Sequence, residues 1–343
     1  MRAAFFVFDA AKNTLGRAYA LWLATEALGW ETRFVSPSIE SPWAPLSGET
    51  DFLATLTDDA PAAAEWADVL VALKPWRGSL DVALRVAKPL GKKVAVDVDD
   101  PDWEAVYGLS HKRQLLVAAQ KLRSRSFVLT DYRLRWYTAR AQHVLVSNPA
   151  LHHWYPGAAV VPHARAPRAE VLPHTRAEDV EVAFVGTVAP HKGIDEIREA
   201  VARAGGMRLT VTGDAPPDAR PHERWLGTTT LAEGLELIDR ADIVALPSRS
   251  GAYGVGQLPV KLIDAMMAGR AIVASDVGPI AWALGGSGIL VPPGGVDELT
   301  DALVQLRSPE LRTELGARAH RRAIDCFTPQ AVGPELAAGL GYG

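Results

Sequence analysis

The segment after the expected strand 243–246 has the composition of an anion-binding loop. It spans 247–259 and contains three glycines, Gly251, Gly254 and Gly256. Glycines let backbone amides approach an anion closely, and a helix that begins directly after such a loop adds oriented N–H groups and the positive end of its dipole. A helical pattern does begin there, so the loop is predicted to hold a phosphate. A flexible surface loop is the alternative.

Residues that could neutralise or orient a phosphate-bearing ligand lie beside this loop. Lys261 and Asp264 stand three residues apart on the expected helix 260–268 and therefore share a face. The lysine suits a diphosphate, and the carboxylate could accept hydrogen bonds from the two vicinal hydroxyls of a ribose. An ordinary surface ion pair is the alternative. A further cation, Lys192, follows the expected strand 181–184, where it could reach a phosphate or remain solvated.

Several function classes are excluded by motif and composition. No GxxxxGK[ST] loop occurs, and neither half carries a GxGxxG fingerprint, which argues against P-loop NTPases and NAD enzymes. The formal net charge of −4 argues against a nucleic-acid partner. With Cys326 as the only cysteine, no internal disulfide can form. No run of about 18 apolar residues occurs, so we expect a cytoplasmic protein.

Short apolar strands alternate with helices along the 343 residues, which predicts parallel sheets covered on both faces. We expect an α/β protein of two Rossmann-like, doubly wound domains: residues 1–165, a linker at 166–180, and residues 181–325. A tail at 326–343 could cross back to the first domain. The expected strands are 3–8, 32–36, 68–73, 93–98, 142–147, 158–162, 181–184, 207–211, 243–246, 271–274 and 288–291.

The second half resembles the retaining glycosyltransferases of family 4, which have the GT-B fold of two Rossmann-like domains facing a central cleft. The resemblance is dense over about 183–327 and only architectural over 1–165. Its motifs are FVGTVAPHKGIDEIREA, LTVTGD, ADIVALPS, PVKLIDAMMAGRAIVASDVG and GILVPPGGVDELTDAL. It implies a nucleotide-sugar donor, UDP or GDP, a hydroxyl acceptor (a glycan, a lipid-linked or a small molecule) and no required cofactor or metal.

The resemblance also implies site residues. Lys192 is similar to the lysine that contacts the donor diphosphate, and Asp264 stands where the family has the second glutamate of its E-x7-E motif. The backbone of 226–228 occupies the segment that reads the base. The full set expected to bind the donor is Gly16, Gly186, Thr187, Lys192, Gly213, Leu226, Thr228, Gly254, Gly256, Gln257, Leu258, Lys261 and Asp264.

Two departures from the family pattern stand in this donor region. The first glutamate of E-x7-E falls on Gly256, and the arginine that often follows the strand-end glycine is Thr187. A diphosphate leaving group carries about two negative charges, and stabilising such developing charge is usually the largest catalytic effect. We therefore expect Lys261 to replace the missing arginine and to act catalytically together with Lys192.

In the first half, the expected strand 93–98 leads into Asp99 and Asp100 rather than into the family's histidine-containing loop. We expect these carboxylates to face the cleft and to bind acceptor hydroxyls or assist proton removal. A divalent metal site and a simple strand-end cap are the alternatives.

Residues 111–140 of the first half carry eight Lys and Arg residues against one acid. An apolar stripe of leucine and alanine runs within this stretch. Such a basic amphipathic segment could dock on an anionic membrane surface, which would make the protein peripheral at the inner membrane face, or it could be a helix with a solvated side.

Together these observations predict a glycosyltransferase that retains the anomeric configuration. Two rival functions remain open. One is a nucleotide-sugar epimerase on the same scaffold, which needs no acceptor. The other is a non-catalytic subunit that binds sugar nucleotides, which the glycine at position 256 would allow.

Overall fold

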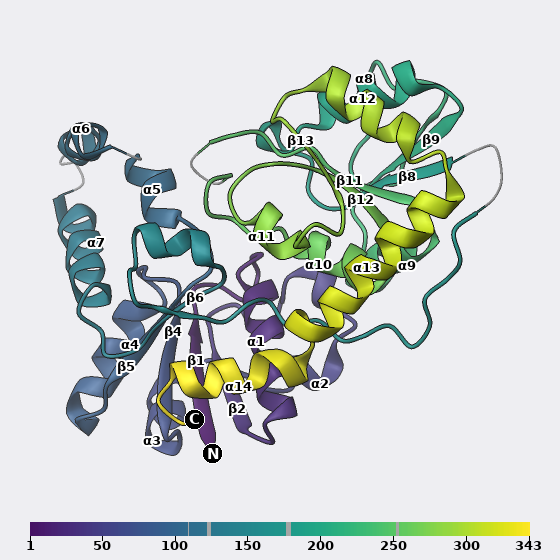
Figure 1. Cartoon of the computed structure of the whole chain (residues 1–343). Helices are drawn as coiled ribbons and strands as arrows, with labels where there is room; N and C mark the ends of the chain where they lie inside the picture. Colours follow the sequence, from purple (N-terminus) through teal and green to yellow (C-terminus); the bar gives the residue numbers. More distant parts are fainter. Residues whose placement is uncertain (109, 122–124, 176–179, 252–253) are drawn as a thin grey trace. The chain divides into compact units, whose positions relative to one another are not determined.

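The computed structural model describes residues 1–108, 110–121, 125–175, 180–251 and 254–343. The chain forms two compact units (Figure 1). The first unit comprises Met1–Ala164 together with Pro329–Gly343, and the second comprises Arg165–Thr328. The expected linker at 166–180 thus lies within the second unit, and its residues 176–179 lie outside the described residues.

The first unit is built on a seven-stranded parallel sheet of order β3-β2-β1-β4-β5-β6-β7. Buried apolar residues dominate its central strands, as parallel strands covered on both faces require. The strands are β1 Arg2–Val7, β2 Glu31–Val35, β3 Leu56–Thr57, β4 Val69–Leu73, β5 Val94–Val98, β6 Val144–Val146 and β7 Ala159–Val160.

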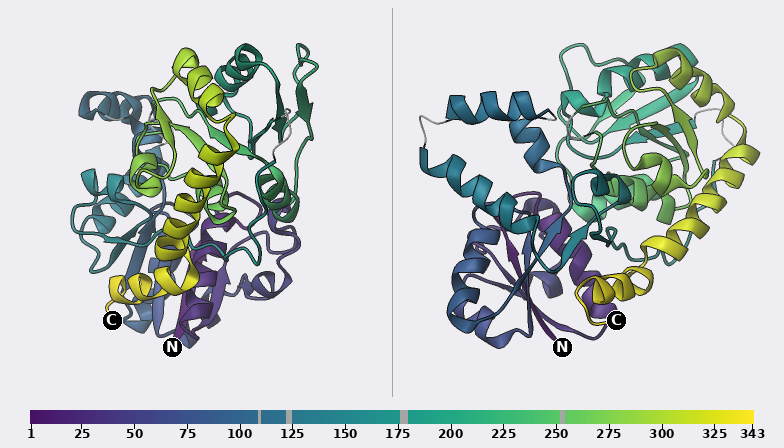
Figure 2. Two further views of the ribbon diagram at one scale, coloured as in Figure 1. Left: turned by 45° about the vertical axis from the view of Figure 1, so that its right-hand side comes forward. Right: turned by 60° about the vertical axis from the view of Figure 1, so that its left-hand side comes forward.

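Helices cover both faces of this sheet: α1 and α14 pack together on one face, and α3 and α4 lie on the other (Figures 1 and 2). Alternate residues of β1 divide between the two faces. Phe6 belongs to the core under α3 and α4, whereas Phe5 stacks on Phe34. The helices are α1 Leu15–Ala27, α2 Thr50–Leu53, α3 Ala60–Trp66, α4 Leu80–Ala87, α5 Asp102–Tyr107, α6 His111–Lys121, α7 Arg125–Thr138 and α14 Pro329–Gly339.

The second unit has a six-stranded parallel sheet of order β10-β9-β8-β11-β12-β13. One apolar core lies under α8 and α12, and a second lies under α10 and α13 on the other face. The elements are β8 Val180–Phe184, α8 Ile194–Ala204, β9 Met207–Val211, β10 Glu223–Trp225, α9 Leu231–Arg240, β11 Ile243–Leu246, α10 Val260–Met267, β12 Ala271–Ser275, α11 Ile280–Leu284, β13 Ile289–Val291, α12 Val296–Gln305 and α13 Pro309–Phe327.

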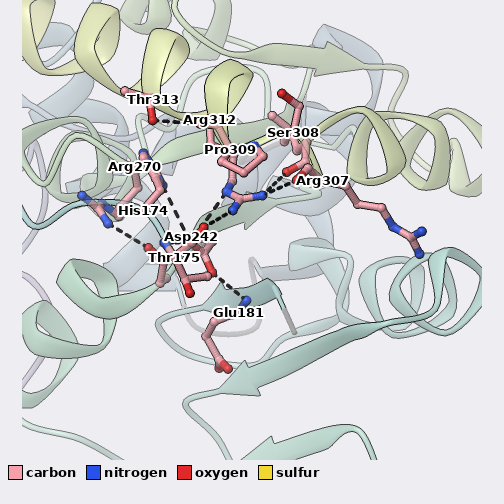
Figure 3. Close-up of polar contacts among 12 residues, drawn as sticks. His174, Thr175, Glu181, Asp242, Arg270, Arg307, Ser308, Pro309, Arg312 and Thr313 are labelled. Atoms are coloured by element: carbon pink, nitrogen blue, oxygen red, sulfur yellow. Dashed lines mark hydrogen bonds and ion pairs between the residues drawn. The ribbon is translucent and has the colours of Figure 1, made fainter. Parts of the chain in front are cut away.

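A buried polar network lies at the end of this sheet opposite the predicted phosphate loop (Figure 3). Both carboxylate oxygens of Asp242, which precedes β11, accept backbone N–H groups, from Thr175 at 2.8 Å and from Glu181 at 3.0 Å. The guanidinium of Arg312, on α13, lies 3.6 Å from the same carboxylate and donates to the carbonyl of Thr175. Arg270 donates to the carbonyl of Leu172. The network thus holds residues 172–175 against the rest of the second unit.

Candidate active site

The predicted phosphate loop lies at the carboxyl end of β11. Leu246 is the last strand residue, Pro259 is the N-cap of α10, and Leu258 is buried in the core under that helix. Ala252 and Tyr253 lie outside the described residues. A small pocket is formed at this place by the loop and its neighbours; the residues that line it are His191, Lys192, Ser248, Gly254, Gln257, Pro259, Val277 and Ile280.

Lys192 is brought to this loop by a close approach of two backbones. Gly193 has φ +70°, and a Cβ at this position would lie 1.8 Å from the carbonyl oxygen of Pro247, so only glycine fits. The Lys192 ammonium then donates a hydrogen bond to Oε1 of Gln257 at 2.8 Å. Two residues that the sequence predicted for the donor site are therefore in contact.

Lys261 lies on α10 and places its ammonium over the end of β8. Its Nζ lies 4.9 Å from the ring centroid of Phe184, and a Cβ on Gly186 would lie 2.3 Å from the same atom. Burial lowers the pKa of Lys261 to about 7, with the positive charge of Lys192 adding to the fall and Asp264 opposing it. The two ammonium groups are thus close enough to repel each other. A single anionic ligand bound by both would relieve this repulsion.

Asp264 is 5% exposed, and its carboxylate is held by an arginine that sequence reasoning missed. Nε of Arg165 donates to Oδ1 of Asp264 at 2.9 Å, and Arg165 is itself 7% exposed. The two residues are 99 positions apart in the chain, and nothing in the composition of the segment around Arg165 signals the contact. The carboxylate expected to bind a ribose is therefore already part of a buried ion pair.

The remaining positions that the sequence predicted for the donor site in the second unit lie at the ends of β8, β9 and β10. The N–H of Gly186 donates to Oγ1 of Thr212 at 2.6 Å, which joins the ends of β8 and β9. Leu226, after β10, donates its N–H to Val211, and the next residue pairs with the carbonyl of Gly213. Thr187 and Thr228 are exposed at this rim, and Gly256 is buried.

A third cation at the loop, Arg249, is directed toward α8. Its guanidinium forms an ion pair with Glu196, with Nη2 and Oε2 2.9 Å apart, and Asp195 lies 3.7 Å away. The N–H of Arg249 also donates to the carbonyl of His191 at 2.9 Å. Arg249 therefore secures the loop to the segment that carries Lys192.

In the first unit, Asp99 and Asp100 follow β5 as expected, but a lysine that the sequence did not suggest lies among them. Nζ of Lys74 lies 3.0 Å from Asp99, 3.2 Å from Asp100 and 2.8 Å from Asp102. These three carboxylates have the spacing of a possible metal site. In this structure the ammonium of Lys74 supplies the positive charge that a metal would bring.

Gly16 lies in the first turn of α1, and its N–H donates to the carbonyl of Asn13. The next residue, Arg17, forms a buried ion pair with Asp97, with Nη2 and Oδ1 2.6 Å apart. Arg17 also donates to the carbonyl of Val161 at 2.8 Å. This arginine ties α1 to the strand β5 that carries the acidic residues.

Comparisons with known proteins find similar sequences and similar structures. The profile of the family described as "Glycosyl transferases group 1" matches residues 179–308. Alpha-D-kanosaminyltransferase of Streptomyces kanamyceticus is 29% identical over 46% of this chain and 44% of its own length. D-inositol 3-phosphate glycosyltransferase of Mycobacteroides abscessus is 31% identical over 42% of this chain and 34% of its own. The chain thus spans less than half the length of these curated relatives.

The solved structures extend the likeness to almost the whole chain. Anabaena HepE in complex with UDP matches with a TM-score of 0.72 at 15% identity, over 99% of this chain and 100% of that one. A sucrose-phosphate synthase of Thermosynechococcus elongatus matches with a TM-score of 0.67 at 17% identity, over 98% and 97%.

The fold is therefore GT-B, with two Rossmann-like domains of seven and six parallel strands. Residues 179–308 match the group 1 glycosyl transferases, which confirms the resemblance drawn from the sequence motifs of the second half.

Proposed function

We propose that this protein transfers a sugar from a nucleoside diphosphate to a hydroxyl acceptor with retention of the anomeric configuration. The observation that carries the proposal is the pair of ammonium groups, Lys192 and Lys261, at the strand ends beside the loop before α10. Such an arrangement suits a diphosphate, because cations and helix N–H groups stabilise the charge that develops on the leaving group.

The reaction proposed is the one the family implies. The bond between the anomeric carbon and the diphosphate oxygen breaks, and a bond to the acceptor oxygen forms on the same face of the sugar. The acceptor proton passes to the departing diphosphate. Lys192 and Lys261 are the proposed catalytic residues on the donor side, Asp264 is proposed to bind the ribose, and the backbone at 226–228 is proposed to read the base.

We propose UDP as the nucleotide, with GDP as the next candidate, since Anabaena HepE binds UDP-glucose. A thermal-shift panel of UDP-, GDP-, ADP- and dTDP-sugars tests this, because a ligand at 100 times its Kd stabilises the native state by about 2.7 kcal/mol. A shift with UDP-sugars is expected. No shift with any nucleotide would exclude the proposal.

Replacing Lys261 by alanine tests the role of the second cation. We expect the affinity for UDP and the transfer rate each to fall about tenfold or more, the loss of roughly 1.4 kcal/mol of charge stabilisation. Arg321→Ala removes an exposed cation of the same unit and is expected to change neither quantity. Unchanged affinity and turnover in Lys261→Ala would mean that Lys261 does not contact the diphosphate.

The glycine at position 256 favours one other candidate function, a non-catalytic subunit that binds sugar nucleotides. Product analysis separates the functions. Release of free nucleotide only when acceptor is present supports the transferase, and binding without turnover supports the subunit. An isomerised donor would instead indicate an epimerase.

On the acceptor side, we propose that a sugar or polyol hydroxyl binds at the carboxyl ends of β4 and β5, near Asp99 and Asp100. The support is the group of three carboxylates after β5, of which Asp100 and Asp102 are half-buried. Asp100→Asn is expected to raise the KM for acceptor severalfold and to leave UDP affinity unchanged. An unchanged acceptor KM would remove Asp100 from the acceptor site.

We also propose that α6 and α7 contact an anionic membrane surface, at the cytoplasmic side. Large apolar side chains are exposed on these helices: Leu115 (69%), Leu116 (63%), Leu129 (65%) and Trp136 (60%). Exposed cations lie among them, including Arg113 and Arg140. Co-sedimentation with vesicles containing phosphatidylglycerol, and not with pure phosphatidylcholine, is expected. Among the described residues, no helix combines the length and apolarity that spanning a bilayer needs.

A further inference from the structure

Lys261 and Asp264 lie one turn apart on α10, at a spacing where a lysine and an aspartate ordinarily pair. The structure shows a different pairing. Oδ1 of Asp264 accepts a hydrogen bond from Nε of Arg165 at 2.9 Å, and both residues are buried. The backbone of Arg165 is fixed as well, because its N–H donates to the carbonyl of Phe327 at 2.8 Å.

Because Asp264 pairs with Arg165, it does not neutralise the charge of Lys261. Within the part of the chain that the structure describes, no carboxylate lies within 4.0 Å of its ammonium, which lies against Gly186 and the ring of Phe184. When Lys261 is protonated, the three cations Lys192, Lys261 and Arg165 and the carboxylate of Asp264 have a net charge of +2 among themselves. The diphosphate of a nucleotide sugar has the matching negative charge.

We propose that Arg165 is a positioning residue of the donor site, which holds Asp264 and thereby keeps the ammonium of Lys261 available to the diphosphate of the nucleotide. Arg165 does not itself contact the ligand. The inference rests on the proposed function, because it assigns a role to Arg165 at that same site. It also gives a reason for a buried arginine at the first residue of the second unit.

This arrangement predicts that the affinity for diphosphate depends on pH through Lys261, and that the pairing of Arg165 with Asp264 sets the pH at which it changes. A purely structural ion pair would not have this effect. The pKa of Lys261 is about 7, lowered by burial and by Lys192, with Asp264 opposing; His191 also faces this group. A bound diphosphate favours the protonated form of Lys261, so binding takes up a proton. The affinity of the protein for diphosphate therefore falls as pH rises through about 7. If Asp264 were released from Arg165, its carboxylate would raise that pKa further and compete with the diphosphate.

The test uses inorganic pyrophosphate, which lacks ribose and base and therefore reports on the cations alone. Its affinity for the full-length protein is measured by calorimetry between pH 6 and 9 in the wild type, in Arg165→Met and in the double variant Arg165→Met/Asp264→Asn. In Arg165→Met we expect affinity at pH 6.5 to fall about tenfold and the pH midpoint to move upward. In the double variant, affinity is expected to return to within about threefold of the wild type.

The decisive result is the upward move of the pH midpoint in Arg165→Met together with its reversal in the double variant, since a residue that only stabilises the fold would not move a binding midpoint. Wild-type affinity and midpoint in Arg165→Met, or a double variant as weak as the single one, would overturn the inference. If Arg165→Met does not fold, Arg165→Lys carries the test. Lysine keeps the positive charge but lacks the planar guanidinium, so we expect a smaller loss of pyrophosphate affinity and a smaller shift of the pH midpoint than in Arg165→Met. Wild-type affinity and midpoint in Arg165→Lys would again overturn the inference.

Failure of the inference can be told from failure of the proposed function. A wild-type protein that binds UDP and pyrophosphate, with variants that behave as the wild type does, refutes the role of Arg165 alone. A wild-type protein that binds neither ligand refutes the proposed function, and the role of Arg165 with it.

Discussion

Lys74 holds three carboxylates of the first unit together, and its own backbone is strained, with φ +77° for a residue that is not glycine. We predict that Lys74→Met leaves Asp99, Asp100 and Asp102 as a site for a divalent cation, because oxygen ligands at this spacing suit such ions. The variant is expected to lose about 3 kcal/mol of unfolding free energy without metal and to regain part of it in millimolar Mn²⁺.

The control for this prediction is Lys74→Met/Asp102→Asn, which removes one carboxylate and is expected to respond less to Mn²⁺. Differential scanning calorimetry with and without the ion measures both. If Lys74→Met showed no gain with the ion, we would conclude that the carboxylates are not spaced as metal ligands once the lysine is gone.

Asp102 gives this cluster a pH dependence. Burial raises its pKa to about 7, the neighbouring Asp100 and Asp99 add to the rise, and Lys74 opposes it. Between about pH 4 and pH 7 the native state keeps the Asp102 proton, whereas the unfolded state has released it. The stabilisation is therefore complete below about pH 4 and is lost as the pH rises through 7. Asp102→Asn is expected to be more stable relative to the wild type at pH 8 than at pH 5. Equal differences at the two pH values would contradict the assignment.

The sequence indicated which residues of the expected donor site lie near one another, but not the ion-pair partners of Asp264 or of the acidic residues after β5. Lys192 and Gln257 are 65 positions apart, but each lies after a strand of the same expected parallel sheet, and Lys261 lies in the first turn of the helix that follows; the shared strand-end edge and the family motifs were enough to place them together. Arg165 and Lys74 were missed because their partners lie 99 residues away in one case and 26 and 28 in the other. Ion pairs made across such distances leave no periodic signal.

At the scale of elements, α13 is attached to β11 by a buried charge pair. Arg312 is fully buried and lies 3.6 Å from Asp242. Removing one partner of a buried pair leaves the other charge uncompensated, so Arg312→Met is expected to lower the unfolding free energy by about 3–5 kcal/mol. Arg321→Met, an exposed position on the same helix, is expected to change it by less than about 0.5 kcal/mol.

Urea unfolding followed by circular dichroism measures this difference. A loss below about 1 kcal/mol in Arg312→Met would show that the hydrogen bonds of Asp242 to Thr175 and Glu181 suffice to hold the carboxylate.

The segment before β8 carries a second pH-dependent group in the same network. Burial lowers the pKa of His174 to about 4, and the cations Arg270 and Arg312 oppose its protonation while Asp242 favours it. The neutral histidine is thus the native form. The contribution of neutral His174 to the unfolding free energy is complete above the ordinary histidine pKa of about 6.5 and is lost as pH falls toward 4. The unfolding free energy should fall between pH 7 and 4.5, and His174→Gln should flatten this slope.

The long elements were the easiest to predict from periodicity. The sequence pattern predicts helices over 194–204 and 231–240, which are the observed α8 and α9, and the expected strands 207–211 and 243–246 are β9 and β11. The strands β3 and β10, of two and three residues, were missed. β6, β7 and β13 are as short but stand within apolar runs, which β3 and β10 lack; β3 and β10 depend on the neighbours with which they pair.

At the scale of the whole molecule, composition alone misjudges the segment 165–175. Its prolines, arginines and acids are those of an exposed linker, yet Arg165 pairs with Asp264 and Arg168 with Asp239 at 2.7 Å. The segment thus belongs physically to the second unit. Sequence composition records which side chains are polar, and it does not record that Arg165 has a buried partner.

The chain also returns to its first unit at the end, through α14. A Cβ on Gly333 would lie 3.1 Å from the carbonyl oxygen of Ala24, so α14 lies directly against α1. Nδ1 of His143 lies 3.1 Å from the carbonyl oxygen of Gly339, and Tyr342 packs edge-on against Trp30. These contacts cover one face of the first sheet, whose apolar surface would otherwise meet water.

Deleting 329–343 is therefore expected to destabilise the first unit and spare the second. Hydrogen exchange should increase in α1 and β6, which lose contacts with α14, and should stay at wild-type rates in α10 and β12. Gly333→Ala is the milder test. The added methyl group is expected to push α14 from α1 at a cost of about 1–3 kcal/mol, with the same pattern of exchange. A uniform increase across both units would mean that the two sheets unfold as one cooperative body, and unchanged exchange in α1 would show that α14 is not needed to cover it.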